Sequence, residues 1–295
     1  MALDGSALIA HTTDLDLVIR HVLAGLGHGI HVGRERGAGV EFSEYRAYAP
    51  GDEWRRVDWK LMARADRYFV REAERDSHVA VWLVLDATAS MQEPSRAIEG
   101  LDKLAYARVM LGCVAAIAQR QGDAFGLVVL TDGQVQFTPA ARGPRQQQRV
   151  LAQLNRATAA GALPDADTLR ASLHFARSPG VVFVASDFLD WPSPLSEALV
   201  RLRHMRHDVR ALCLQTQAEC DADFDTRPAY RDPEHGAGVF RFGASLRDAY
   251  RRNREDHFGQ VTRETRRHDV LLTAARIEQA PGEVLRLWLR QGGRA

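Results

Sequence analysis

The chain has 295 residues, 45% of them hydrophobic and 26% charged, and its formal net charge is +1. These values are typical of a globular protein with a large core, built as one large domain with an appendage or as two small domains. The near-neutral charge argues against nucleic acid or an anionic membrane as a partner. No apolar stretch approaches the roughly 20 residues that span a bilayer.

Three isolated cysteines, Cys113, Cys213 and Cys220, show no metal-binding or redox spacing. Such usage is typical of a reducing compartment. The first residues lack the basic start and apolar core of a signal peptide. We therefore expect a cytoplasmic protein that does not insert into a membrane.

The first predicted element is a short amphipathic helix over residues 12–26. Leu15, Val18, Ile19 and Val22 recur in it at helical spacing, and Thr12 or Thr13 can cap its start. The pattern predicts a helix with one buried face.

Residues 34–76 differ in kind from the rest, because they contain ten basic and ten acidic residues among 43. Polar and apolar residues alternate over 40–48, which favours a β segment. Aromatic residues run through the whole stretch, so we interpret it as a compact charged subdomain rather than a linker. The predicted domains are residues 1–77, with the N-terminal helix and the charged subdomain, and residues 78–295.

From residue 78 the pattern becomes an alternation of strands and helices. Such alternation predicts an α/β domain with a doubly wound, mainly parallel sheet. An irregular insertion interrupts it near 217–243. Strands are expected at 79–86, 125–131, 134–138, 181–186, 208–214 and 269–274, and helices at 98–121, 144–158, 166–177, 194–206, 244–267 and 281–291. Acidic residues interleave with the arginines of the helix at 244–267, which indicates a solvated face rather than a nucleic-acid site.

Polar residues follow two of the apolar strands at the point where each ends. Asp86, Thr88 and Ser90 follow the first, and Ser186 and Asp187 end another. Ligands bind beyond the carboxyl ends of strands in open α/β sheets. Carboxylate and hydroxyl oxygens suit a hard divalent cation. The sequence therefore predicts one Mg²⁺ site built from two loops, with Mn²⁺ and Ca²⁺ as alternatives.

Two resemblances follow from these residues. The pattern Asp86-x-Thr88-x-Ser90 with a later Asp187 resembles the metal-ion-dependent adhesion site of von Willebrand factor A domains. The run 33–52, with Arg55-Arg-Val-Asp-Trp59 and the segments 63–64 and 70–72, resembles the signature of the bacterial family called domain of unknown function 58. The resemblance implies a von Willebrand A-like fold. It also implies a role as partner or adaptor of a MoxR-type AAA+ ATPase, because members are typically encoded beside one.

The family's middle loop usually supplies a threonine to the site, and this chain departs from that pattern. Keeping the register of Leu173 puts Asp167 at the threonine position and Thr168 one place on. The site would then hold three carboxylates, Asp86, Asp167 and Asp187. Alternatively, Thr168 slips into the role or the site is degenerate.

The charged signature also has two interpretations. Its arginines and carboxylates can pair with one another and hold a small subdomain together. Alternatively, they form a docking face, because Arg, Trp and Tyr are enriched at interface hot spots. The candidate partner-binding residues are Arg34, Arg36, Arg46, Asp52, Arg55, Asp58, Trp59 and Arg64.

The function that the sequence favours is protein–protein interaction rather than catalysis, because neither a phosphate-binding loop nor a nucleophile elbow is present. The alternative is a metal-dependent hydrolase or phosphotransferase in which Asp86 and Asp187 bind the metal and Asp167 is the base. A structural scaffold with a degenerate site is the third possibility.

Overall fold

The computed structural model describes residues 5–26, 44–47, 62, 69–72, 80–173, 178–224, 229–231, 239–241 and 244–290. The chain forms two compact units, one of residues 1–33 and 79–295 and the other of residues 34–78. This division differs from the predicted one, which grouped residues 1–77, because the N-terminal helices pack on the core of the larger unit.

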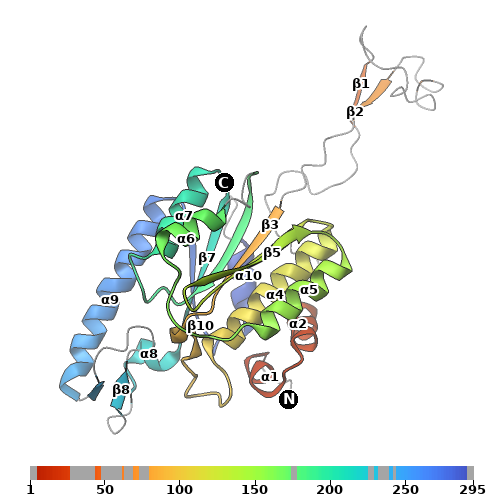
Figure 1. Ribbon diagram of the computed structural model, residues 1–295. Helices are drawn as coiled ribbons and strands as arrows, with labels where there is room; N and C mark the ends of the chain where they lie inside the picture. Colours follow the sequence, from red (N-terminus) through yellow and green to blue (C-terminus); the bar gives the residue numbers. More distant parts are fainter. Residues whose placement is uncertain are drawn as a thin grey trace. The chain divides into compact units, whose positions relative to one another are not determined.

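A six-stranded sheet forms the centre of the larger unit (Figure 1). Neighbouring strands are parallel except for β5, which runs antiparallel to β4. The tight turn between these two strands contains Asp132 and Gly133, both with positive φ, as a two-residue hairpin requires. The order across the sheet is β10 (Leu271–Arg276), β7 (Asp208–Gln215), β6 (Gly180–Ser186), β3 (Ala80–Asp86), β4 (Phe125–Thr131) and β5 (Gln134–Ala141). The predicted α/β class with a mainly parallel sheet is confirmed.

Both faces of the sheet are buried at its central strands, which explains why β3 is a continuous apolar run. Val81, Leu83 and Leu85 point into one core cluster, and Trp82 and Val84 point into the other. One face is covered by α4 (Lys103–Gln121), α5 (Pro144–Arg156) and α10 (Pro281–Arg290). The other is covered by α6 (Ala166–Ser172), α7 (Pro194–His204) and α9 (Ala244–Arg267) (Figure 1).

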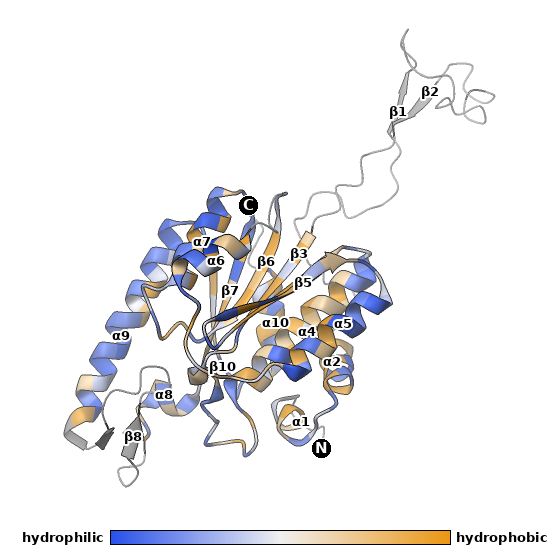
Figure 2. Cartoon of the chain, in the orientation of Figure 1, coloured by the Kyte–Doolittle hydropathy of each residue, from blue (hydrophilic) through white to orange (hydrophobic). Residues whose placement is uncertain are grey.

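Helix α4 is buried on nearly every side. The helices α1 (Gly5–His11) and α2 (Leu15–Ala24) pack against it together with α5 and α10. Its residues are accordingly mostly hydrophobic, whereas those of α9 are mostly hydrophilic (Figure 2). The predicted helix at 12–26 corresponds to α2, but its cap is Asp14, which accepts from the Leu17 N–H, rather than Thr12 or Thr13. Helix α1 was not anticipated.

Short elements occupy parts of the insertion predicted near 217–243. Helix α8 (Gln217–Asp221) follows β7, and β8 (Ala229–Arg231) pairs antiparallel with β9 (Val239–Arg241). In the smaller unit, β1 (Glu44–Ala47) pairs antiparallel with β2 (Phe69–Glu72). Strand β1 lies within the β segment predicted at 40–48. No helix of the described residues is long and apolar enough to cross a bilayer.

Candidate functional site

The carboxyl ends of β3 and β6 meet at one edge of the sheet. The two strands are paired with Leu85 beside Ala185, so Asp86 and the pair Ser186–Asp187 follow side by side. The chain continues from β3 to β4 on one side while β6 lies on the other, so the strand order reverses here. Such a switch point is where open α/β sheets place their ligand sites.

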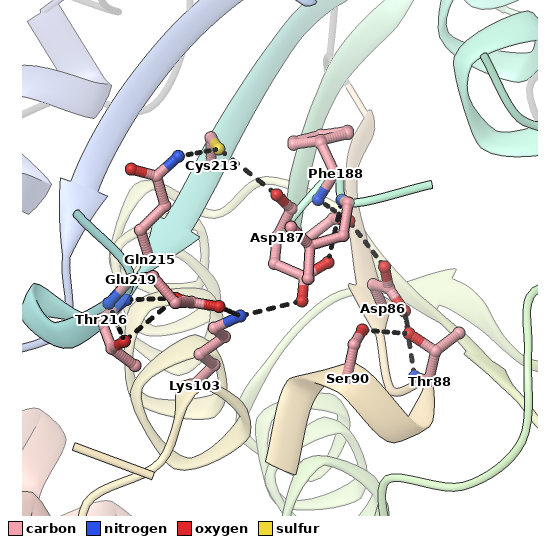
Figure 3. Close-up of polar contacts among 12 residues, drawn as sticks. Asp86, Thr88, Ser90, Lys103, Asp187, Phe188, Cys213, Gln215, Thr216 and Glu219 are labelled. Atoms are coloured by element: carbon pink, nitrogen blue, oxygen red, sulfur yellow. Dashed lines mark hydrogen bonds and ion pairs between the residues drawn. The ribbon is translucent and has the colours of Figure 1, made fainter. Parts of the chain in front are cut away.

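Asp86 is at the centre of a buried hydrogen-bond network (Figure 3). Its Oδ1 accepts from the backbone N–H of Thr88 at 3.0 Å and from the Thr88 hydroxyl at 2.8 Å. Its Oδ2 accepts from the Ser186 hydroxyl at 2.6 Å. The Thr88 and Ser90 hydroxyl oxygens lie 3.2 Å apart. Thr88 directly precedes the 3-10 helix η2 (Ala89–Gln92), and Ser90 lies within it.

The electrostatics of this carboxylate are unfavourable for its charged form. Burial, followed by the negative charge of Asp187, raises the pKa of Asp86 from 3.8 to about 7, although the bonds from Ser186 and Thr88 oppose the shift. A cation at this position would favour the ionised form.

Asp187 is paired with a lysine that the sequence analysis did not single out. The Lys103 ammonium, at the start of α4, donates to Asp187 Oδ2 at 3.1 Å and to Glu219 Oε1 at 2.6 Å (Figure 3). The Lys103 side chain is fully buried. Burial alone would lower the pKa of Lys103, but Asp187 and Glu219 outweigh it and raise the pKa.

A strained turn follows Asp187 and shapes the site's rim. Phe188 has φ of 52°, the left-handed region that a bulky residue rarely adopts. The Phe188 N–H donates to Ser186 Oγ at 3.0 Å, and the His257 ring lies 2.8 Å from the Phe188 carbonyl oxygen. The next residue, Leu189, is 46% exposed, so the rim carries an apolar side chain.

Asp167 and Thr168 do not join this cluster. The Asp167 side chain is 91% exposed and pairs with Arg170 on the same helix. The Thr168 hydroxyl donates to Asp165, which caps α6. The cap places Thr168 in the first turn of α6, with its side chain in solvent. The segment 159–161 lies against the first loop instead, where the Ala89 N–H donates to the Gly161 carbonyl at 2.9 Å.

The remaining donor set fits a hard divalent cation. No three His, Cys, Asp or Glu side chains in the described part of the chain are grouped so as to hold a metal. A cation site here would therefore use two carboxylates and two hydroxyls, which are the oxygen ligands that Mg²⁺ accepts alongside water. These residues are Asp86, Thr88, Ser90 and Asp187, all of them buried.

The candidate partner-binding residues are in the smaller unit. Arg46 lies in β1, opposite Val70 of β2. The other candidates lie outside the described residues, and they are Arg34, Arg36, Asp52, Arg55, Asp58, Trp59 and Arg64.

Lys103 and Glu219 were not among the predicted site residues, and Ser186 was noted only as the polar residue before Asp187. The sequence carries a signal for Glu219, because Thr216-x-x-Glu219 after a strand is a capping box. Lys103 is one of only two lysines in an arginine-rich chain and follows the helix-capping Asp102. Neither signal indicates that the two side chains meet.

The site and the sheet define an α/β domain with a loop cluster of carboxylates and hydroxyls at the carboxyl edge of its sheet. A family model described as "Protein of unknown function DUF58" matches residues 44–260. The chain belongs to this family.

Curated relatives are uncharacterized proteins of Mycobacterium bovis and Mycobacterium tuberculosis. Each is 28% identical over 284 residues, which cover 94% of this chain and 87% of the relative. Similar solved structures include BatB from Bacteroides thetaiotaomicron (12% identity, 72% of this chain and 97% of that one, TM-score 0.47). They also include the VWA domain of SpRpn10 (10% identity, 74% and 99%, TM-score 0.43). These two similarities concern the fold alone.

Proposed function

We propose that this protein is a protein–protein interaction module whose carboxyl-edge site takes a divalent cation and docks a partner. The observation that carries the proposal is the convergence of Asp86, Thr88 and Ser90 with Asp187 at the switch point of the sheet. The partner class we propose is a MoxR-type AAA+ ATPase, as the family resemblance implies. We propose no catalytic role.

The hydrogen bonds at the carboxyl edge support a binding site. Thr88 and Ser186 hold the Asp86 carboxylate by hydrogen bonds, so its position is set before any ligand arrives. When bound, Mg²⁺ would supply an electrophilic centre that a partner's carboxylate can complete. The exposed Leu189 beside Asp187 adds an apolar contact of the kind found at interface centres.

Cation binding is the first testable part of the proposal. Excess Mg²⁺ should raise the thermal midpoint of the protein by roughly 5–10 °C if its concentration is about 100 times Kd. Asp86→Ala should abolish this rise, because it removes the central carboxylate. Differential scanning calorimetry in Mg²⁺ and in EDTA measures both.

Asp167→Ala is the matched control, since it removes a carboxylate that the sequence placed in the site and the structure places in solvent. It should keep the full rise in Mg²⁺. A loss as large as that of Asp86→Ala would restore the three-carboxylate site. If Mg²⁺ leaves the thermal midpoint unchanged in the natural chain and in both variants, the site does not bind the cation and this part of the proposal is wrong.

Partner capture tests the second part. The tagged full chain and its Asp86→Ala variant would be incubated with cell extract in Mg²⁺ and in EDTA, and the bound proteins identified by mass spectrometry. Capture of an AAA+ ATPase by the natural chain in Mg²⁺ alone supports docking through the cation. Capture in both conditions moves docking to the charged signature of residues 34–76. If no ATPase is captured and generic phosphoesters are turned over in an Asp86-dependent way, the protein is an enzyme instead.

A further inference from the structure

Lys103 is buried among the residues of the cation site. Its side chain has no exposed surface, and it reaches Asp187 at 3.1 Å and Glu219 at 2.6 Å. A buried ammonium persists only when carboxylates compensate the lost hydration. The other positive residues of this chain are arginines, apart from Lys60. A lysine delivers one compact charge to Asp187, whereas the planar arginine fork favours bidentate pairing.

The surroundings carry more negative than positive charge. Asp187 and Glu219 contact the Lys103 ammonium, and the buried Asp86 lies near Asp187. Glu93 adds a fourth carboxylate, with Lys103 and Arg96 as its positive neighbours. Burial, followed by the charge of Glu219, raises the pKa of Glu93, although Lys103 and Arg96 oppose the shift. Among the described residues, these four carboxylates outnumber Lys103 and Arg96, so negative charge is in excess at this edge of the sheet.

Glu219 is held in place independently of the lysine. Its Oε2 accepts from the Thr216 backbone N–H at 2.6 Å and from the Thr216 hydroxyl at 3.1 Å, while its Oε1 accepts from Lys103. The Glu219 carboxylate can thus retain the ammonium if Asp187 is engaged elsewhere. The two acceptors of Lys103 come from different elements, the end of β6 and the start of α8 (Figure 3).

We propose that Lys103 is a built-in counter-cation that competes with the divalent cation for Asp187, and that Glu219 holds its ammonium when the divalent cation binds. The inference rests on the proposed cation site and adds its regulation. Lys103 keeps the cation-free site folded and at the same time weakens cation binding. Glu219 offsets this competition by drawing the ammonium away from Asp187.

Two variants should change affinity in opposite directions. Lys103→Met with Glu219→Gln removes one positive and one negative charge and frees Asp187, so Mn²⁺ should bind at least tenfold more tightly. In Glu219→Gln alone, the side-chain amide faces the ammonium with either its N–H₂ group or its neutral oxygen. Neither compensates the charge of Lys103 as a carboxylate does, so Lys103 stays on Asp187. Mn²⁺ binding should then weaken several-fold. Titration of the full chain with Mn²⁺, followed by electron paramagnetic resonance of the free ion, measures all three proteins.

Asp86→Ala in the double-variant background separates the two proposals. The role of Lys103 is supported if the double variant binds Mn²⁺ more tightly than the natural chain and if adding Asp86→Ala abolishes this binding. Mn²⁺ binding that is equal, within twofold, in the natural chain and both variants overturns it and leaves the cation site standing. The absence of binding in every folded protein overturns both. If the double variant does not fold, Glu219→Gln decides, and unweakened binding by that variant contradicts the inference.

Discussion

Asp86 is a carboxylate that folding places in a low-dielectric site with three hydrogen-bond donors and too little positive charge. Its pKa in the folded protein is about 7, against an ordinary value of 3.8. Between these two values the folded chain keeps a proton that the unfolded chain releases. By linkage, this residue's contribution to stability is full at low pH and falls as pH rises toward and through 7.

The cation-free protein should therefore lose stability between pH 5 and pH 8, and Asp86→Asn should lose less. Urea unfolding in EDTA at the two pH values measures the free energy of unfolding of each protein. Asparagine keeps the size of the side chain without its titration, so the difference between the two slopes belongs to Asp86. Parallel slopes would mean that the Asp86 carboxyl is ionised throughout this range. Adding Mg²⁺ at pH 8 should restore stability to the natural chain alone.

Among the elements, α4 determines where the Lys103 ammonium lies. Asp102 caps this helix by accepting from the Ala105 N–H at 2.6 Å, and Lys103 follows as the first helical residue. The helix ends at Gly122, whose φ of 76° allows the left-handed cap. Because α4 is buried on nearly every side, its register is set by packing and its start by the cap.

Asp102→Ala should lower the free energy of unfolding by about 1 kcal/mol, since it leaves a helix N–H without its acceptor. Asp102→Ser should come close to the natural chain, because a serine hydroxyl can accept the same bond. Denaturant unfolding of the three proteins gives the comparison. If serine destabilises as much as alanine, the charge of Asp102 matters more than the cap.

At the scale of the whole molecule, the N-terminal helices belong to the domain core. Ile19 of α2 is 1% exposed and packs in the cluster that α4 and the sheet share. An alanine Cβ at Gly112 of α4 would come within 2.4 Å of the Ile19 Cδ1 atom, so the two helices approach closely there. The larger unit therefore joins residues 5–26 to a domain whose first strand begins more than fifty residues later.

Ile19→Ala should cost about 2–5 kcal/mol of stability, as deletion of a buried aliphatic side chain does. Leu17→Ala is the matched control on the same helix, because Leu17 is 50% exposed. It should change the free energy of unfolding by less than about 0.5 kcal/mol. Denaturant unfolding of both variants checks the difference. Equal, small effects would show that α2 does not contribute to the core.

The sequence by itself determined the α/β class, most strand positions and the meeting of Asp86 with Asp187. These follow from local pattern, since an apolar run with a polar end marks a buried parallel strand and neighbouring parallel strands share their carboxyl edge. Helix α9 was predicted with the bounds that it has, because its polar composition and length are local properties.

Only the tertiary structure decided which charged side chains meet. Lys103 and Asp187 are 84 positions apart, and Lys103 and Glu219 are 116 apart. Pairing across such separations depends on the packing of α4 beneath the sheet and on the capping box of α8, which no periodicity encodes. The same holds for Asp167. Alignment with the family's middle loop predicted Asp167 in the site. In the structure, α6 begins after its cap at Asp165, and Asp167 faces solvent.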